Sequence, residues 1–467
     1  MLMIITALGS ANLTNTCWAR AKWPLFNLCI RSEIKFSTIP DKVLRNHRDE
    51  DCDDFLPWLE QKACMQISSV LYIGKSAFGR GLYASKHIEA GDCILRVPHS
   101  VQLAPDNLPP RIYSSLGKEV SNVAKVAILL LHHMRLGQKS EWGPYISRLP
   151  PASEMHNTNL WTNNELEMIR QSSVYPETMK QRNVIEKEFL AIKPVLDQFR
   201  ENFSDFSLED FAYACALVTS RAWESPRGVS MIPFADFLNH DGASEAFLWS
   251  KERKLFSEVI ADRNYVPGDQ VLVRYGKFSN HTLALDFGFT LPYNINDQVE
   301  VQLDIPHDDH LRQMKLQLLQ RFPAPAIKDV NGFSPSEKCF TIKEVKSGCS
   351  KGRGIPQAFR AFARIVCCNY QELSDLAWEA AQNDGRLARN PLTNKNKEIE
   401  AHQLMLSRVN QLIEDYDASI KSLEQTFSRH MLRRHPLRRQ MARDLFSGEI
   451  RVLMSASAWL KHYCATI

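Results

Sequence analysis

The stretch that decides the fold is residues 231–289, which read MIPFADFLNHDGASEAFLWSKERKLFSEVIADRNYVPGDQVLVRYGKFSNHTLALDFGF. An apolar approach, residues 232–238, ends in the polar turn Asn239-His240-Asp241-Gly242. Residues 254–260 and 270–275 follow, and both runs have the composition of β-strands. The stretch therefore predicts a polar turn followed by two strands.

Several shorter features complete this stretch. Pro267-Gly268-Asp269 lies between the two runs and is a turn of the kind that reverses a strand. Tyr275-Gly276 then opens a loop, Ser279-Asn280 starts a short helix, and Phe287-Gly288-Phe289 closes the stretch. Each feature alone is ordinary, because turn residues tolerate left-handed backbone and a Tyr that ends a strand usually serves packing.

Together, in this order and spacing, these residues resemble the second half of a SET methyltransferase domain. The resemblance is to the branch that contains the plant Rubisco large-subunit lysine methyltransferases and the actin-histidine methyltransferase. The matching pieces are Asp236-Phe-Leu-Asn239-His240, Gly268-Asp-Gln-Val-Leu-Val-Arg-Tyr275-Gly276, and Ser279-Asn280 with Phe287-Gly288-Phe289. The resemblance implies an α+β fold, in which a β-rich SET domain is interrupted by a helical insert and followed by an all-helical C-terminal lobe.

We expect three parts along the chain. Residues 1–50 form a leader, residues 51–298 form the SET catalytic domain with a helical insert at about 106–222, and residues 299–467 form a helical lobe that binds the protein substrate. Helical patterns support the insert, including an apolar run at 123–134 and the capping box Thr162-Asn-Asn-Glu165.

The leader is basic and contains hydroxyl residues. Its first 32 residues contain Arg20, Lys22 and Arg31 but no Asp or Glu. This composition is typical of an organellar transit peptide, although a disordered start is the other reading. We expect a chloroplast protein of the stroma, with the mitochondrion or the cytosol as alternatives.

The overall composition excludes several classes of site. With 467 residues the chain is long enough for two or three domains, and 44% hydrophobic and 24% charged residues are ordinary for a globular protein. A net charge of +4 implies no general attraction to nucleic acid, and no apolar run approaches the length of a membrane span. The 11 cysteines contain no CxxC, so we expect no metal site. We expect a monomer that binds neither nucleic acid nor membranes.

A glycine-containing loop near the amino terminus is the second candidate part of the site. Phe78-Gly79-Arg80-Gly81 contains two glycines that let the main chain approach a ligand closely, which alone is weak evidence. The resemblance implies that this loop contacts S-adenosyl-L-methionine.

The other roles also follow from the resemblance. It implies that Tyr275 is the catalytic residue, whose hydroxyl lies beside the transferring methyl group. The cofactor-binding residues that it implies are Phe78, Gly79, Arg80, Gly81, Arg221, Asp236, Asn239, His240, Tyr275 and Phe287. Arg221 has two interpretations. It contacts the cofactor, or it is a cation at the C-terminal end of the helix at 208–220 that stabilises the last carbonyls.

The chemistry of methyl transfer fits such a site. A free lysine has a pKa near 10.4, so at pH 7 about one part in 2,500 is the neutral nucleophile, a handicap of roughly 4.6 kcal/mol. A narrow apolar channel disfavours the ammonium form and removes part of this handicap. Rubisco-methylating relatives carry a second tyrosine where this chain has Phe287, and we expect Phe287 to relax the limit on successive methylations.

Three functions remain open at the level of sequence. The first is a lysine N-methyltransferase that acts on a non-histone plastid protein such as the Rubisco large subunit or aldolase. The second is a protein-histidine N-methyltransferase, and the third is a catalytically silent SET-fold scaffold. A run of arginines between 429 and 443 is either a solvated turn or a docking patch for an acidic protein surface.

Overall fold

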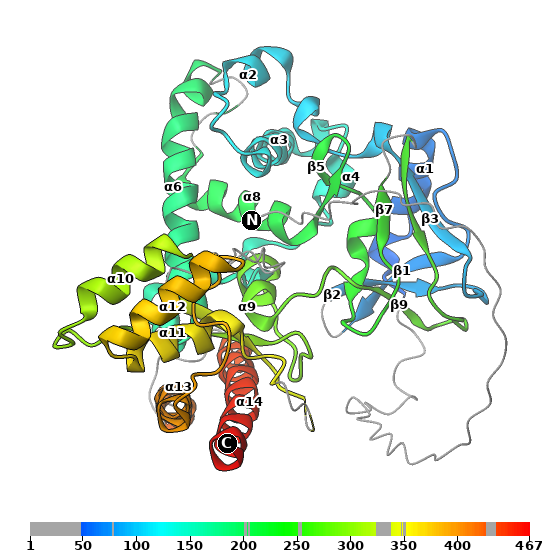
Figure 1. Cartoon of the computed structure of the whole chain (residues 1–467). Helices are drawn as coiled ribbons and strands as arrows, with labels where there is room; N and C mark the ends of the chain where they lie inside the picture. The colour runs from blue at the N-terminus through cyan, green and yellow to red at the C-terminus, as the bar shows by residue number, and fades with distance from the viewer. Residues whose placement is uncertain are drawn as a thin grey trace, which may run out of the picture.

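The structure is a computed structural model that describes residues 48–76, 79–199, 203, 206–250, 255–323, 338–346, 348, 352–425 and 436–467. Strands gather on one side of the molecule, and the helices of the insert and of the C-terminal part occupy the other (Figure 1). This arrangement confirms the predicted α+β class. Most of the leader and Phe78 lie outside the described residues.

One sheet assembles the candidate site from three distant parts of the chain. It has four strands in the order β1 (Leu71–Ser76), β2 (Gly79–Ala84), β9 (Gln270–Val273) and β6 (Asn239–His240). The predicted glycine loop is therefore the start of strand β2. The predicted turn begins only at Asp241, because Asn239 and His240 pair in parallel with Leu272 and Val273.

The two strand-like runs of residues 254–275 do not form a hairpin. β8 (Phe256–Ile260) pairs with β3 (Cys93–Pro98) and β7 (Leu248–Ser250) in a separate sheet, whereas β9 pairs with β2 and β6. The Pro267-Gly268-Asp269 turn is held against the end of β2 instead. The Gly268 amide donates to the Ala84 carbonyl at 2.8 Å, and the Ala84 amide donates to the Asp269 carbonyl at 2.9 Å.

The insert supplies the helices α2 (Pro110–Ser115), α3 (Asn122–Leu136), α4 (Gly143–Ile146), α5 (Asn163–Leu166), α6 (Val174–Gln198) and α8 (Leu208–Arg221). The predicted capping box at Thr162 is present, and a second one at Ser207 starts α8. α8 leads into the hairpin of β4 (Ala222–Ser225) and β5 (Gly228–Met231), so its last residue lies where the helix joins the strand-rich part.

The C-terminal part begins with a two-stranded sheet of β10 (Gln298–Gln302) and β11 (Cys339–Lys343). Its helices are α10 (Arg312–Arg321), α11 (Gln357–Cys367), α12 (Tyr370–Gln382), α13 (Lys395–Gln425) and α14 (Pro436–Thr466). Apolar residues recur at helical spacing from Ile399 to Leu423, and this stretch lies within α13. No helix of the described residues is both long and apolar enough to cross a membrane.

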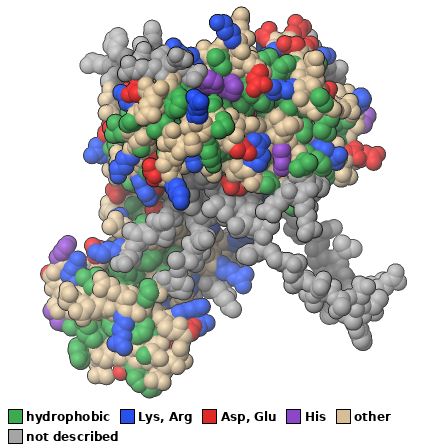
Figure 2. Space-filling model, turned by 90° about the horizontal axis from the view of Figure 1, so that it is seen from above, with side chains coloured by type: hydrophobic (Ala, Val, Ile, Leu, Met, Phe, Trp, Pro, Cys, Tyr) green, Lys and Arg blue, Asp and Glu red, His purple; other side chains and the backbone are tan. Residues whose placement is uncertain are grey.

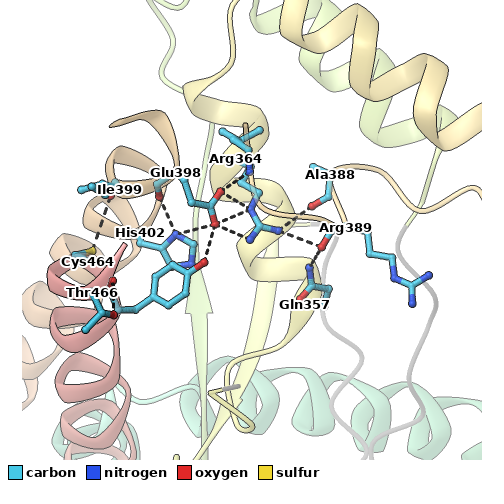
Figure 3. A network of polar contacts seen from close by, with 11 residues as sticks. Gln357, Arg364, Ala388, Arg389, Glu398, Ile399, His402, Cys464 and Thr466 are labelled. Atoms are coloured by element: carbon cyan, nitrogen blue, oxygen red, sulfur yellow. Dashed lines mark hydrogen bonds and ion pairs between the residues drawn. The ribbon is translucent and has the colours of Figure 1, made fainter. Parts of the chain in front are cut away.

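A buried ion pair joins three of these helices (Figure 3). Arg364 on α11 donates to the Glu398 carboxylate of α13 through Nε at 2.9 Å and Nη2 at 2.7 Å. Tyr463 on α14 donates to the same carboxylate at 3.2 Å, and the Arg364 guanidinium also donates to the Ala388 carbonyl at 3.0 Å. Both charged side chains are about 2–3% exposed. The cost of burying the two charges is therefore offset by the hydrogen bonds among these residues and not by water.

The predicted run of arginines is only partly within the described residues, because Arg429, Arg433 and Arg434 lie outside them. Arg438 is buried and donates to the Glu165 carboxylate at 2.7 Å and to the Met155 carbonyl at 3.0 Å. For this residue the structure matches neither the solvated turn nor the docking patch, since its guanidinium ties α14 to the insert.

Candidate functional site

Tyr275 follows β9 and is held at both its main chain and its hydroxyl. The Tyr275 hydroxyl donates to the Leu238 carbonyl at 2.6 Å, and the Tyr275 amide donates to His240 Nδ1 at 3.1 Å. Burial raises the pKa of Tyr275 well above its ordinary value, so the phenol stays protonated at physiological pH. A protonated hydroxyl with a fixed position is suited to orienting a reacting group.

His240 presents a polar atom that has no protein partner in the described part of the chain. Its Nδ1 accepts from the Tyr275 amide, so the proton of the neutral imidazole is assigned to Nε2. Burial lowers the pKa of His240 to about 4, which keeps the ring neutral at pH 7. The Nε2 atom is buried and unpartnered there, and it is therefore a donor available to a ligand.

Asn239 connects the Asn-His strand to the glycine strand. Its Nδ2 donates to the Arg80 carbonyl at 3.1 Å and to the Ser76 hydroxyl at 3.4 Å. Gly81 permits this approach, because a Cβ atom there would lie 2.9 Å from Asn239 Nδ2 and 2.4 Å from Gln270 Nε2. The structure thus brings Tyr275, Asn239, His240 and the glycine strand together, as expected from the sequence.

The Arg80 side chain is directed to other partners. Its Nε donates to the Asp49 carboxylate at 2.8 Å, and its Nη1 donates to the Arg148 carbonyl at 3.0 Å. It is the main-chain carbonyl of Arg80, therefore, that meets Asn239. Phe78, the other residue expected from this loop, lies outside the described residues.

Arg221 and Asp236 form a charged pair inside the site. Arg221 Nη1 donates to the Asp236 carbonyl at 3.0 Å and lies 3.8 Å from the Asp236 carboxylate. Burial raises the pKa of Asp236 to about 6, although the nearby Arg221 charge opposes the shift. Asp236 Oδ1 and Arg221 Nε are both buried without a hydrogen-bond partner in the described chain. Of the two readings of Arg221, this placement favours a role in the site.

Phe287 and Trp223 flank Tyr275 with aromatic rings. The Phe287 ring stacks on Tyr275 with centroids 5.1 Å apart, and the Trp223 ring meets Tyr275 edge-on at 5.7 Å. These side chains line a narrow cleft, whose other lining residues are Ser220, Arg221, Ala222, Asp236 and Leu238. Apolar rings and polar or charged side chains thus line the same cleft.

The insert controls the position of Phe287. A π-helix, Leu283–Phe287, ends at Gly288, whose φ is +78°. A Cβ at Gly288 would lie 2.9 Å from the Asn157 amide nitrogen, and Asn157 Nδ2 donates to the Asp286 carbonyl at 2.7 Å. Only glycine fits this contact without strain.

Three residues of the site were not predicted from the sequence. Tyr145 of α4 donates its hydroxyl to Asp236 Oδ2 at 2.8 Å, and no sequence pattern pointed to it. Trp223 could have been found, because it lies two positions after Arg221. Gln270, the first residue of β9, places a buried and unpartnered Nε2 over Gly81.

The described residues contain no group of three or more His, Cys, Asp or Glu side chains arranged to hold a metal ion. What they do contain is a set of buried polar atoms without hydrogen-bond partners: Asp236 Oδ1 and Arg221 Nε in residues that line the cleft, and His240 Nε2 and Gln270 Nε2 in residues outside that lining. A buried polar atom costs free energy unless it is paired, so this set fits an organic ligand with charged and hydrogen-bonding groups.

Comparison with protein families gives two matches. The SET domain matches residues 79–276, and the Rubisco LSMT substrate-binding domain matches residues 306–453. These are the two parts that the sequence resemblance implied, and they confirm it.

Individual relatives are similar at low identity. The aldolase-lysine N-methyltransferase of Arabidopsis thaliana, a chloroplastic protein, is 26% identical over 284 residues, which are 58% of this chain and 58% of that protein. The actin-histidine N-methyltransferase of Gallus gallus is 23% identical over 452 residues, covering 91% of this chain and 72% of that protein. This chain spans little more than half the length of the plant relatives.

Solved structures show the same fold. Rubisco LSMT bound to sinefungin and monomethyllysine aligns with a TM-score of 0.67 at 20% identity, covering 89% of this chain and 92% of that one. Rubisco LSMT bound to AdoMet aligns with a TM-score of 0.65 at 20% identity, covering 89% of this chain and 93% of that one.

Proposed function

Because the chain combines a SET domain with a Rubisco LSMT substrate-binding domain, as that branch of the SET-domain proteins does, we propose that it is an S-adenosyl-L-methionine-dependent protein N-methyltransferase. Its proposed target is a lysine of a non-histone plastid protein, such as the Rubisco large subunit or aldolase. The observation that carries the proposal is that Asn239 donates to the Arg80 carbonyl while its neighbour His240 accepts from the amide of Tyr275, which lines the cleft.

The unpartnered polar atoms fit the proposed cofactor. Its amino-acid end carries one carboxylate and one ammonium, and Arg221 Nε and Asp236 Oδ1 offer a donor and an acceptor of the matching charges. His240 Nε2 and Gln270 Nε2 are further buried donors without a hydrogen-bond partner in the described chain. When bound, the cofactor supplies a methyl group on a sulfonium.

The residues of the chain would then position the nucleophile. Tyr275, fixed by the Leu238 carbonyl and by His240, orients the amine, while Trp223 and Phe287 exclude water from the cleft. The apolar wall disfavours the ammonium form of the substrate and thereby raises the fraction of neutral amine. His240 acts as a donor and not as a base, because its unpartnered nitrogen is the one that carries the proton.

The cleft favours lysine over histidine as the target. Aromatic rings on either side of Tyr275 suit a flexible chain of methylenes that ends in an amine. Orienting one nitrogen of an imidazole requires a hydrogen bond to the other. The charged side chains that line the cleft, Arg221 and Asp236, already face each other. The similarity to actin-histidine N-methyltransferases over 91% of the chain keeps histidine as the second candidate.

The test is a transfer assay with a methyl-labelled cofactor. The purified chain is incubated with unmethylated Rubisco large subunit, with aldolase and with actin, and labelled peptides are identified by mass spectrometry. We expect label on a lysine of a plastid protein. Label on an actin histidine would favour the second candidate. Cofactor binding by calorimetry, without transfer to these proteins or to a plastid extract, would instead indicate a scaffold.

Phe287→Tyr is expected to change the number of methyl groups added. A hydroxyl beside Tyr275 would add a hydrogen-bond donor where the Phe287 ring now presents only hydrocarbon, and would hold the amine or a water where a second methyl group has to fit. We expect the ratio of mono- to trimethylated product to rise by about tenfold, the equivalent of about 1.4 kcal/mol. Mass spectrometry of the product peptides measures this ratio, and identical ratios for both proteins would contradict the role of Phe287.

The role of the leader, the bounds of the two parts and the oligomeric state are further proposals. We propose that residues 1–50 address the plastid, that residues 51–298 and 299–467 are the catalytic and substrate-binding parts, and that the protein is a monomer. On the face seen in Figure 2, Lys and Arg side chains are interspersed with Asp and Glu. This pattern supports a protein partner over nucleic acid. Imaging of a fluorescent fusion to residues 1–50 tests the address, and light scattering tests the monomer.

A further inference from the structure

We infer that the segment of residues 48–54, which precedes the region matched as a SET domain, completes the cofactor site, with Asp49 as a residue that positions the glycine strand through Arg80. This inference rests on the proposed function. It adds to the site a segment that the site residues expected from the sequence did not include.

Asp49 is buried at the edge of the sheet and is held by charge. Its side chain is 1% exposed, and its carboxylate accepts from Arg80 Nε at 2.8 Å and lies 3.4 Å from the Lys75 ammonium. Its own amide donates to the Ile73 carbonyl of β1 at 3.1 Å. Burial alone would raise the pKa of Asp49, but the hydrogen bonds and charges of Arg80 and Lys75 lower it, so the carboxylate is ionised at neutral pH.

The rest of the segment is fixed by Arg148 of the insert. Arg148 Nη2 donates to the Asp51 carbonyl at 2.9 Å and pairs with the Asp54 carboxylate. The Arg148 carbonyl in turn accepts from Arg80 Nη1 at 3.0 Å. The Arg80 guanidinium is therefore held from two sides, by the segment and by the insert.

The held position of the Arg80 side chain affects the site through the main chain of the glycine strand. Arg80 lies between Gly79, whose φ is +93°, and Gly81, and two glycines leave the strand free to adopt other conformations. The Arg80 carbonyl accepts the Asn239 amide at 3.1 Å. With the guanidinium released, the free energy needed to order Gly79–Gly81 has to come from cofactor binding, and affinity falls.

A second ion pair in the same segment provides a matched control. Arg48 Nε donates to the Asp53 carboxylate at 2.8 Å, the same distance as in the Arg80–Asp49 pair. Its side chains are 62% and 45% exposed, and it does not contact the glycine strand through any hydrogen bond in the described chain. Removing this pair changes the charged groups of the segment without releasing Arg80.

The experiment measures the Kd of S-adenosyl-L-methionine by calorimetry on the full chain. Asp49→Asn is expected to raise the Kd about tenfold and Arg80→Met, which also loses the bond to the Arg148 carbonyl, at least as much. The double variant is expected to raise it no further than Arg80→Met alone, because both changes break the contact between these two side chains. Arg80→Lys, which keeps a cation beside Asp49, is expected to recover about half of the loss on the logarithmic scale. The control Arg48→Ala/Asp53→Ala keeps the wild-type Kd. For Asp49→Asn and for the control we expect kcat at saturating cofactor within about twofold of wild type.

The outcomes separate this inference from the proposed function. A wild-type chain that binds no cofactor overturns the proposed function and, with it, the inference. A wild-type chain that binds, together with an Asp49→Asn variant of equal Kd or additive single effects, overturns the inference alone. Loss of folded protein in Asp49→Asn, seen by circular dichroism, also counts against it, because the contact would then serve the fold as a whole.

Discussion

Tyr275→Phe is expected to lower kcat for methyl transfer by about 100-fold or more, while the Kd of the cofactor stays within about threefold. The phenyl ring would keep its stacking on Phe287 and its edge contact with Trp223, so the shape of the cleft is preserved. Only the hydroxyl that donates to the Leu238 carbonyl is lost. A loss in kcat without a change in cofactor affinity indicates an interaction made in the transition state.

Tyr213 offers the control for this substitution. Its hydroxyl donates to the Pro150 carbonyl at 2.8 Å, so Tyr213→Phe removes a comparable hydrogen bond outside the residues that line the cleft. We expect a loss in unfolding free energy of about 1 kcal/mol and an unchanged kcat. Radiolabel transfer measures kcat, and urea denaturation measures the free energy of unfolding. If Tyr275→Phe were as active as wild type, the assigned role of its hydroxyl would be refuted.

Glu398→Leu is expected to lower the free energy of unfolding by about 3–5 kcal/mol, because it leaves the Arg364 guanidinium buried without its counter-charge. Arg364→Met combined with Glu398→Leu removes both charges, and we expect it to recover most of that loss. Urea denaturation followed by circular dichroism measures both variants. A double variant as unstable as the single one would show that packing, and not the unpaired charge, is responsible.

The surface pair Arg389–Asp384 is the control for this experiment. Its nitrogen–oxygen distance is 2.7 Å, as in the buried pair, but its side chains are 55% and 41% exposed. Asp384→Ala is therefore expected to change stability by less than about 1 kcal/mol.

The buried pair also predicts a pH dependence. The hydrogen bonds and charge of Arg364 outweigh burial and lower the pKa of Glu398. The unfolded chain takes up the proton first, so this contribution is complete above the unfolded pKa of about 4.3 and is lost as pH falls through the folded value.

Local features of the sequence predicted local structure well. Thr162 and Ser207 each provide a side-chain acceptor for an amide three residues later, and a helix begins at both places. The period of the apolar residues in α13 is likewise a local property, since a helix forms its own hydrogen bonds.

Pairing between distant strands was not accessible in this way. The runs that became β8 and β9 are equally strand-like, and nothing in either indicates that they join different sheets. Partners from far along the chain decide this, β3 for one and β2 for the other. Tyr145 was missed for the same reason, because it reaches Asp236 across 91 positions of sequence.

The candidate site residues were proposed from their order along the chain, and the structure supplied what that order could not. Asn239, His240 and Tyr275 were expected to lie close together and do so, whereas the contact between the Arg80 side chain and Asp49 involves a segment outside the motif. A motif specifies which main-chain positions meet. It does not specify which side chains already have hydrogen-bond partners elsewhere in the fold.

The contact between Gly288 and Asn157 limits how this protein can be re-engineered. A methyl group on residue 288 would lie 2.9 Å from the Asn157 nitrogen, so the two main-chain segments are in close contact. A shift of one segment therefore displaces the other. Transplanting an insert from a relative would consequently move the ring that follows the π-helix, even if every cleft residue were retained. Chimeras should exchange the insert and residues 283–289 as a single block, with the C-terminal helices swapped separately.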